Sequence, residues 1–241
     1  MGTIGMGYGS EWHLLRYLGY HRDYLSREVL KITGGNSIHW LDFDFSRENI
    51  PLKDDGELKG LKFISDEAVH KKWRNFWPPR GNSQNWDAVG KIQTGNGEEW
   101  LLVEAKGHLG EIKSSCGATN IESRQKIVTA LQATSQTFSN LTKPVENWLS
   151  PHYQYANRLA VLHFLMKECE PSVKARLLFI YFYGENRKNE ECPQSKQDWL
   201  PAISKMNEWL GINKNNDLAG RIHILYLPVN PSGRPPRPAT N

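Results

Sequence analysis

Three charged residues with complementary chemistry, Asp87, Glu104 and Lys106, lie on two neighbouring segments that have the pattern of β-strands. The second segment starts as a near-continuous apolar run at residues 100–103 and ends in Glu104 and Lys106, with Ala105 between them. An i, i+2 spacing places two side chains on one face of a strand. Burying such charges costs several kcal/mol unless they are paired or bind something, so the pattern predicts a site.

The two segments are joined by a strong turn sequence. Residues 94–97 read Thr-Gly-Asn-Gly, and the Asn-Gly pair favours a tight turn between antiparallel strands. We therefore predict a β-hairpin that brings Asp87 alongside Glu104 and Lys106. Two carboxylates and a carbonyl oxygen suit a hard cation such as Mg²⁺, and a nearby ammonium can orient or deprotonate an attacking water.

This arrangement resembles the catalytic motif of the PD-(D/E)XK nuclease superfamily, the fold of many restriction endonucleases. The motif corresponds to Asp87 followed by Glu104-Ala105-Lys106, with Trp86 where proline is usual. The resemblance implies a phosphodiesterase, an endonuclease or an exonuclease, that cleaves DNA and depends on Mg²⁺ or Mn²⁺. It implies that Asp87, Glu104 and the Ala105 carbonyl bind the metal. Lys106 would align the water nucleophile.

The motif is short, and other interpretations of the same residues stay open. Acid-x-lysine triplets also occur at residues 57–59 and 111–113. Neither of them lies at the end of an apolar strand whose preceding strand carries an aspartate. A salt-bridged hairpin at a sheet edge would explain the charges without any chemistry. Two functional alternatives are a nucleic-acid-binding or scaffolding protein on the same fold without catalysis, and a metal hydrolase with a smaller phosphate substrate.

Glu11 is a further candidate metal ligand. Ser10 can cap a helix that we predict over about residues 11–30, with a break near residue 19. Glu11 shares a face of this helix with Leu15 and Leu18, and in the resembled family an early helix often supplies an acid to the metal site. A carboxylate in a first turn is also expected from the helix dipole alone.

Gln154 and Arg158 are candidates for contact with the substrate phosphate or the metal. A helix expected over about residues 153–168 is apolar around most of its circumference and is therefore buried. The two polar residues lie one turn apart near its N-terminal end. Several branches of the resembled superfamily place a glutamine on this helix, with a polar or aromatic partner four residues later. Arg158 stands where one branch has a tyrosine. The alternative interpretation is that Gln154 and Arg158 simply form the solvent-exposed end of a buried helix.

The stretch at residues 59–80 interleaves six basic residues with aromatic ones. Basic groups neutralise phosphates and aromatic rings stack on bases, so this stretch is the best candidate for contact with DNA. We expect Lys71, Lys72 and Arg74 to bind phosphate. The alternative is an amphipathic helix over about residues 66–76 with a solvated basic face and its tryptophan packed inward.

The remaining pattern predicts an α/β fold. Further elements are expected at residues 37–45 (a strand or an irregular connection), 121–138 (helix), 175–183 (strand), 197–210 (helix) and 221–227 (strand). This order gives a mixed central β-sheet flanked by helices, and it matches the restriction-endonuclease-like core. We predict one nuclease-like domain at residues 1–227 and an extended, Pro-rich, basic tail at residues 228–241.

Composition limits the class of protein. The chain has 241 residues, of which 39% are hydrophobic, and its net charge of +4 permits a polyanionic partner without requiring one. Three widely spaced cysteines suggest neither a zinc site nor a disulfide framework. No apolar stretch reaches the roughly 18 to 20 residues of a membrane helix, and the N-terminus lacks a signal-sequence pattern. We therefore expect a cytoplasmic protein and no membrane partner; the sequence leaves the oligomeric state open, a homodimer included.

Overall fold

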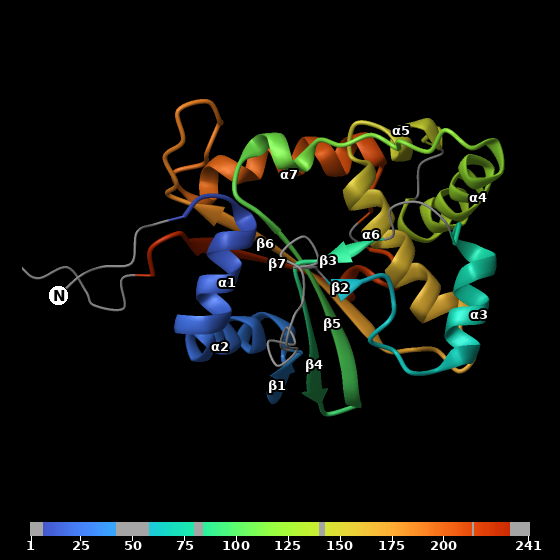
Figure 1. Cartoon of the computed structure of the whole chain (residues 1–241), viewed down its shortest axis with the longest axis horizontal. Coiled ribbons are helices and arrows are strands. Elements are labelled where there is room, and N and C mark those ends of the chain that lie inside the picture. Colours follow the sequence, from blue (N-terminus) through green and yellow to red (C-terminus); the bar gives the residue numbers. More distant parts are fainter. Residues whose placement is uncertain (1–6, 42–57, 80–83, 140–142, 214, 232–241) are drawn as a thin grey trace, which may run out of the picture.

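The computed structural model describes residues 7–41, 58–79, 84–139, 143–213 and 215–231. Five strands form its central sheet: β1 (Ser37–Trp40), β4 (Ala88–Thr94), β5 (Gly97–Lys106), β6 (Ala175–Tyr183) and β7 (Ile222–Pro228). Their order across the sheet is β1-β4-β5-β6-β7 (Figure 1). Pairing is antiparallel from β1 through β4 to β5 and parallel from β5 through β6 to β7, so the sheet is mixed.

The predicted hairpin is present as the pair β4 and β5. Ala88 lies opposite Val103, and Thr94 lies opposite Gly97. Gly97 has a φ of 101°, a conformation that glycine adopts without steric cost, and the Thr94 hydroxyl donates a hydrogen bond to its carbonyl at 2.9 Å. Both strands have neighbours on each side within the sheet, so the alternative of an edge hairpin does not apply.

Helices cover both faces of the sheet. Their bounds are α1 (Ser10–Tyr20), α2 (Arg22–Thr33), α3 (Glu67–Phe76), α4 (Ile121–Phe138), α5 (Glu146–Leu149), α6 (Tyr153–His163) and α7 (Lys196–Leu210). The π-helical turn η3 (Phe164–Glu168) continues α6, and two 3₁₀ turns are η2 (Leu109–Ile112) and η4 (Ala219–Arg221). The short strands β2 (Leu58–Lys59) and β3 (Asn85–Trp86) pair as a second sheet. None of the described helices is long and apolar enough to span a bilayer.

The alternation of side chains along β5 divides the hydrophobic core in two. Leu101, Val103 and Ala105 are fully buried on the face covered by α1 and α2, while Leu102 is buried on the face of α3 to α7. Figure 1 shows these two layers of helices on opposite sides of the sheet. Because Glu104 has the same parity as Leu102, its carboxylate faces α6.

The connections place two strand ends at one edge of the sheet. The crossover from β5 to β6 contains α4, α5 and α6, and the crossover from β6 to β7 contains α7. Parallel strands require such long connections, and their carboxyl ends then lie side by side. In open α/β sheets this edge is the usual place for a ligand site.

The predicted α/β class with a mixed central sheet flanked by helices is confirmed. Three expected elements, at residues 121–138, 175–183 and 153–168, coincide with α4, with β6 and with α6 continued by η3. The helix expected over residues 11–30 consists of α1 and α2, which break at His21 rather than near residue 19. Residues 42–45 of the expected connection, residue 80 of the basic stretch, and residues 232–241 of the expected tail lie outside the described residues.

Candidate functional site

The structure brings Asp87, Glu104 and Lys106 together at the carboxyl end of β5. Asp87 lies in the step between β3 and β4, where its backbone N–H donates to the Val103 carbonyl at 3.1 Å. Its Oδ2 accepts a hydrogen bond from the Ala105 N–H at 2.6 Å. Glu104 and Lys106 lie on one face of the strand, and the Lys106 ammonium donates directly to Glu104 Oε1. The hairpin therefore juxtaposes the three residues as its spacing predicts.

Glu104 is a buried carboxylate with two cationic partners. It is 3% exposed, and its second oxygen, Oε2, accepts from Arg158 Nε at 2.8 Å while Arg158 Nη2 lies 2.7 Å away. Burial alone would raise the pKa of Glu104, but the charges of Arg158 and Lys106 outweigh it and hold the pKa below its ordinary value. Glu104 is therefore ionised at neutral pH.

Asp87 has the opposite behaviour. Burial and the adjacent charge of Glu104 raise the pKa of Asp87 to about 8, against the opposing effects of Lys106 and of the Ala105 N–H. Two neighbouring carboxyl groups thus differ in protonation at pH 7, with Asp87 holding the proton. A divalent cation that replaces the proton would stabilise the two carboxylates, because its charge offsets the repulsion that raises the pKa of Asp87.

Gln154 and Arg158 project from one side of α6 onto this pair. Gln154 Oε1 accepts from the Lys106 ammonium at 3.0 Å, and Arg158 also donates to the Asn85 carbonyl at 2.5 Å. The guanidinium carbon of Arg158 lies 4.8 Å from the ring centroid of Trp86, within the range of a cation–π contact. The structure therefore brings both predicted residues of α6 to the site, where they contact the motif itself.

A small cavity adjoins the motif. Its volume is about 10 Å³, close to the smallest space that holds one water molecule. Its lining includes polar groups of the site, namely Glu104, Lys106, Gln154 and Glu111. The cavity offers no room for a nucleotide or another small organic phosphate, so a larger substrate would approach from outside it.

Glu111 is a neighbour of the site that lies outside the predicted motif. It belongs to η2, just beyond β5, and its Oε2 accepts from the Gly107 N–H at 2.6 Å. Its Oε1 lies 3.3 Å from His108 Nε2, and His108 Nδ1 lies 3.0 Å from Glu190 Oε2. The sequence signal at this position is the acid-x-lysine triplet of residues 111–113, which does not end an apolar strand.

A second buried acid, Glu185, lies at the same sheet edge just after β6. Its Oε1 accepts from the Gly9 N–H at 3.1 Å, and its Oε2 lies 3.2 Å from His13 Nε2. His13 is 1% exposed, and burial lowers its pKa despite the neighbouring carboxylate. This contact fastens the start of α1 to the sheet. Sequence patterns do not indicate this contact, because Glu185 is 176 positions from Gly9 and 172 from His13.

Glu11 lies on the exposed side of α1. Its side chain is exposed in the first turn of α1, while His13 occupies the buried face of that helix. Leu15, predicted to share a buried face with Glu11, is 45% exposed. The prediction that Glu11 points inward is therefore wrong, and its position fits a first-turn carboxylate favoured by the helix dipole.

The basic stretch forms the predicted amphipathic helix, α3. Lys71, Lys72 and Arg74 are exposed, and Arg74 pairs with Glu67 at 2.8 Å. The aromatic residues pack inward instead: the ring of Trp73 lies 4.8 Å from that of Phe164 and stacks on the buried Trp77 at 5.7 Å, while the ring of Phe76 lies 5.3 Å from that of Phe164. They do not form an exposed stacking surface. Helix α3, which carries the three basic residues, packs on η3, at the end of α6 away from Gln154.

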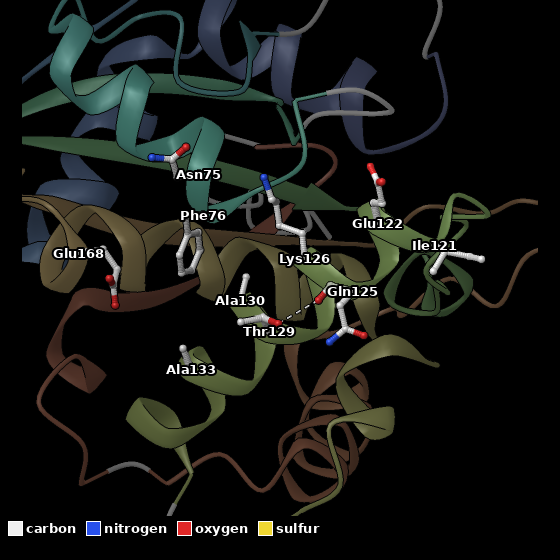
Figure 2. A pocket seen from close by; sticks show the side chains of 10 residues that line it. All are labelled: Asn75, Phe76, Ile121, Glu122, Gln125, Lys126, Thr129, Ala130, Ala133 and Glu168. Atoms are coloured by element: carbon white, nitrogen blue, oxygen red, sulfur yellow. Dashed lines mark hydrogen bonds between the residues drawn. The ribbon is translucent and has the colours of Figure 1, made fainter.

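A much larger groove than the cavity beside the motif lies elsewhere, between α3 and α4. It has a volume of about 760 Å³, and Figure 2 shows the side chains around it. Asn75 and Phe76 come from α3, Glu168 from η3, and the remaining seven lining residues from α4. Its lining includes none of the motif residues. Size alone therefore does not identify the site, and the motif lies in a tighter, more charged environment.

The donor types at the motif suit a divalent cation. Within the described ranges, no three His, Cys, Asp or Glu side chains are grouped so that they could hold a metal ion. Mg²⁺ often takes only one or two protein carboxylates and fills its shell with waters and substrate phosphates, which Asp87 and Glu104 can satisfy. Glu104 is paired with Lys106 and Arg158, so an ion would have to displace the Lys106 contact.

Comparisons with protein-family models, curated proteins and solved structures gave no match. An α/β fold of this kind hosts many unrelated activities, so the fold alone does not define one. The inference of function therefore depends on the geometry and charges of the site.

Proposed function

We propose that this protein is a metal-dependent phosphodiesterase that cleaves DNA on a restriction-endonuclease-like arrangement of its sheet. The observation that carries the proposal is the convergence of Asp87, Glu104 and Lys106 at the carboxyl end of the central strand β5. The pKa values of the two carboxyl groups are shifted in opposite directions: that of Asp87 is raised and that of Glu104 is lowered. Perturbed pairs of this kind cluster at functional sites.

The roles of the residues follow from their chemistry. Asp87, Glu104 and the Ala105 carbonyl would hold the cation, which when bound supplies positive charge at the phosphate oxygens and acidifies a water. Lys106, held between Glu104 Oε1 and Gln154 Oε1, would orient the attacking water by donating a hydrogen bond to it. The positive charge of Arg158 lowers the pKa of Glu104 and so keeps this carboxylate ionised.

Digestion of plasmid and single-stranded oligonucleotides with Mg²⁺ or Mn²⁺, beside an EDTA control, tests this proposal. The Lys106→Ala variant retains both carboxylates, so calorimetry should still detect ion binding while turnover falls by about 10²- to 10⁴-fold. Lys205→Ala, which removes an exposed lysine of α7, is the matched control and should cleave as the parent does. Equal activity of Lys106→Ala and the parent would refute the assignment.

A binding protein on the same fold without catalysis is the second candidate. One observation favours it: both oxygens of Glu104 are already occupied by Arg158 and Lys106, as in a purely structural ion-pair network. The two candidates differ in metal dependence. A binding protein would retain DNA at any EDTA concentration without cleaving it, and Glu104→Gln would leave its affinity unchanged.

A further inference from the structure

We infer that Glu111 accepts the proton of the attacking water, with His108 and Glu190 leading that proton to solvent. The inference rests on the proposed function and names a residue that the motif does not contain. It starts from the environment of Lys106, whose ammonium donates to Glu104 and to Gln154. A group that is donating in this way can orient a water, but it has no lone pair with which to take a proton.

Glu111 provides the acceptor. It lines the same cavity as Lys106, and that cavity has room for about one water molecule. One of its oxygens is held by the Gly107 N–H at 2.6 Å, which fixes the carboxylate next to the end of β5. A water in the cavity would thus meet a hydrogen-bond donor, Lys106, and a proton acceptor, Glu111, on neighbouring walls.

A chain of titratable groups connects Glu111 with solvent. Glu111 Oε1 lies 3.3 Å from His108 Nε2, and His108 Nδ1 lies 3.0 Å from Glu190 Oε2. The side chain of Glu190 is 34% exposed, against 14% for His108. Within the described residues His108 Nδ1 has no hydrogen-bond partner, so the imidazole must turn toward Glu190 before it can pass a proton from that nitrogen.

The water oxygen forms a bond to phosphorus and gives its proton to Glu111. The bond from phosphorus to the leaving oxygen breaks, and the leaving oxygen keeps the electron pair and takes a proton from solvent. The proton on Glu111 then passes through His108 to Glu190. Other charged groups that face this region are Glu104 and Lys106 of β5, His13 of α1 and Glu185 after β6.

Glu111→Gln is the first test, because the amide retains a carbonyl oxygen for the Gly107 N–H but cannot take the proton. We expect kcat to fall by about 10²- to 10⁴-fold. Metal-free DNA affinity, measured by fluorescence anisotropy, and the melting temperature should stay at the parent values. Glu208→Gln, at an exposed acid of α7, is the matched control and should leave kcat unchanged. Parent-like kcat in Glu111→Gln would overturn the inference.

Chemical rescue separates a proton acceptor from a structural support. Glu111→Ala opens space beside the cavity, so added formate should restore part of its kcat, whereas formate should not restore Lys106→Ala. A loss of activity that formate fails to restore would make Glu111 only a support for Gly107 and would overturn the inference. Failure of the proposed function looks different: the parent itself would then not cleave DNA with any divalent metal, and the inference would fall with it.

Discussion

The guanidinium of Arg158 places two nitrogens on a single oxygen of Glu104, with Nε at 2.8 Å and Nη2 at 2.7 Å from Oε2. Arg158 is 3% exposed, so this is a buried ion pair between α6 and the central strand β5. The guanidinium also bonds to the Asn85 carbonyl and to Asn157 Oδ1, which leaves few of its donors unsatisfied. The same contact thus stabilises the fold and keeps a candidate metal ligand charged.

Arg158→Ala should lower the free energy of unfolding by about 3–5 kcal/mol, because it leaves the buried charge of Glu104 without its main partner. Urea denaturation at pH 7 measures the change. Arg74→Ala is the matched control: its pair with Glu67 is exposed, so the free energy of unfolding should hardly change. If the two variants were equally stable, the Arg158 pair would contribute no more than a surface ion pair.

Asp87 should make stability depend on pH in an unusual direction. Its pKa is about 8 in the folded protein, raised from 3.8, so between these values the folded state binds a proton that the unfolded state lacks. The free energy of unfolding should therefore fall as pH rises from about 4 to 8. Glu104, with a lowered pKa, acts in a separate window: its contribution is lost only as pH falls below the ordinary carboxyl range.

The variant Asp87→Asn should remove the fall in stability between pH 4 and 8, and melting curves across this range measure it. In the parent, Mg²⁺ binding should release a proton below pH 8, so calorimetric affinity for the ion should rise with pH and level off above 8. A parent protein with constant stability from pH 5 to 8 would contradict the raised pKa of Asp87.

Lys71 and Lys72 remain predicted phosphate contacts, although the aromatic residues of α3 pack inward. Both lysines are exposed on this helix. The double variant Lys71→Ala, Lys72→Ala should weaken DNA binding and reduce the slope of log affinity against log salt by about one unit per lost phosphate contact. The double variant Lys196→Ala, Lys205→Ala, which removes two exposed lysines of α7, serves as the control for net charge alone. An unchanged slope would show that α3 has only a solvated basic face.

Much of the fold could be predicted because its signals are local. The period of two along β5 placed Glu104 and Lys106 on one face, and the Asn-Gly turn fixed their register with Asp87. Spacing of i, i+4 likewise placed Gln154 and Arg158 on one side of α6. These patterns depend on geometry within one element or one hairpin, so a sequence reveals them.

The rest depends on contacts between distant segments, which periodicity does not report. The packing of α6 on β5 decides whether Arg158 faces phosphate or pairs with Glu104. These two residues are 54 positions apart in the sequence. Glu111, in the 3₁₀ turn η2, and Glu185, in the loop after β6, lie just beyond strand ends and belong to no repeating pattern, so neither was predicted. The basic and aromatic residues of α3 show a different limit of prediction from sequence. An amphipathic helix with packed aromatic residues and a surface for stacking on bases have the same composition.

Gly107, directly after Lys106, should be intolerant of a side chain. A Cβ at this position would lie 3.1 Å from the backbone nitrogen of Ser10 and 3.4 Å from Glu185 Oε2, so the start of α1 would have to move. Gly107→Ala should therefore destabilise the protein by about 1–3 kcal/mol, as overpacking does, and should also lower turnover by displacing Lys106. Gly117→Ala is the matched control, since nothing lies within 4 Å of its Cβ. Thermal unfolding and DNA cleavage measure both effects. Equal stability of the two variants would show that α1 yields easily at this edge and does not position Lys106.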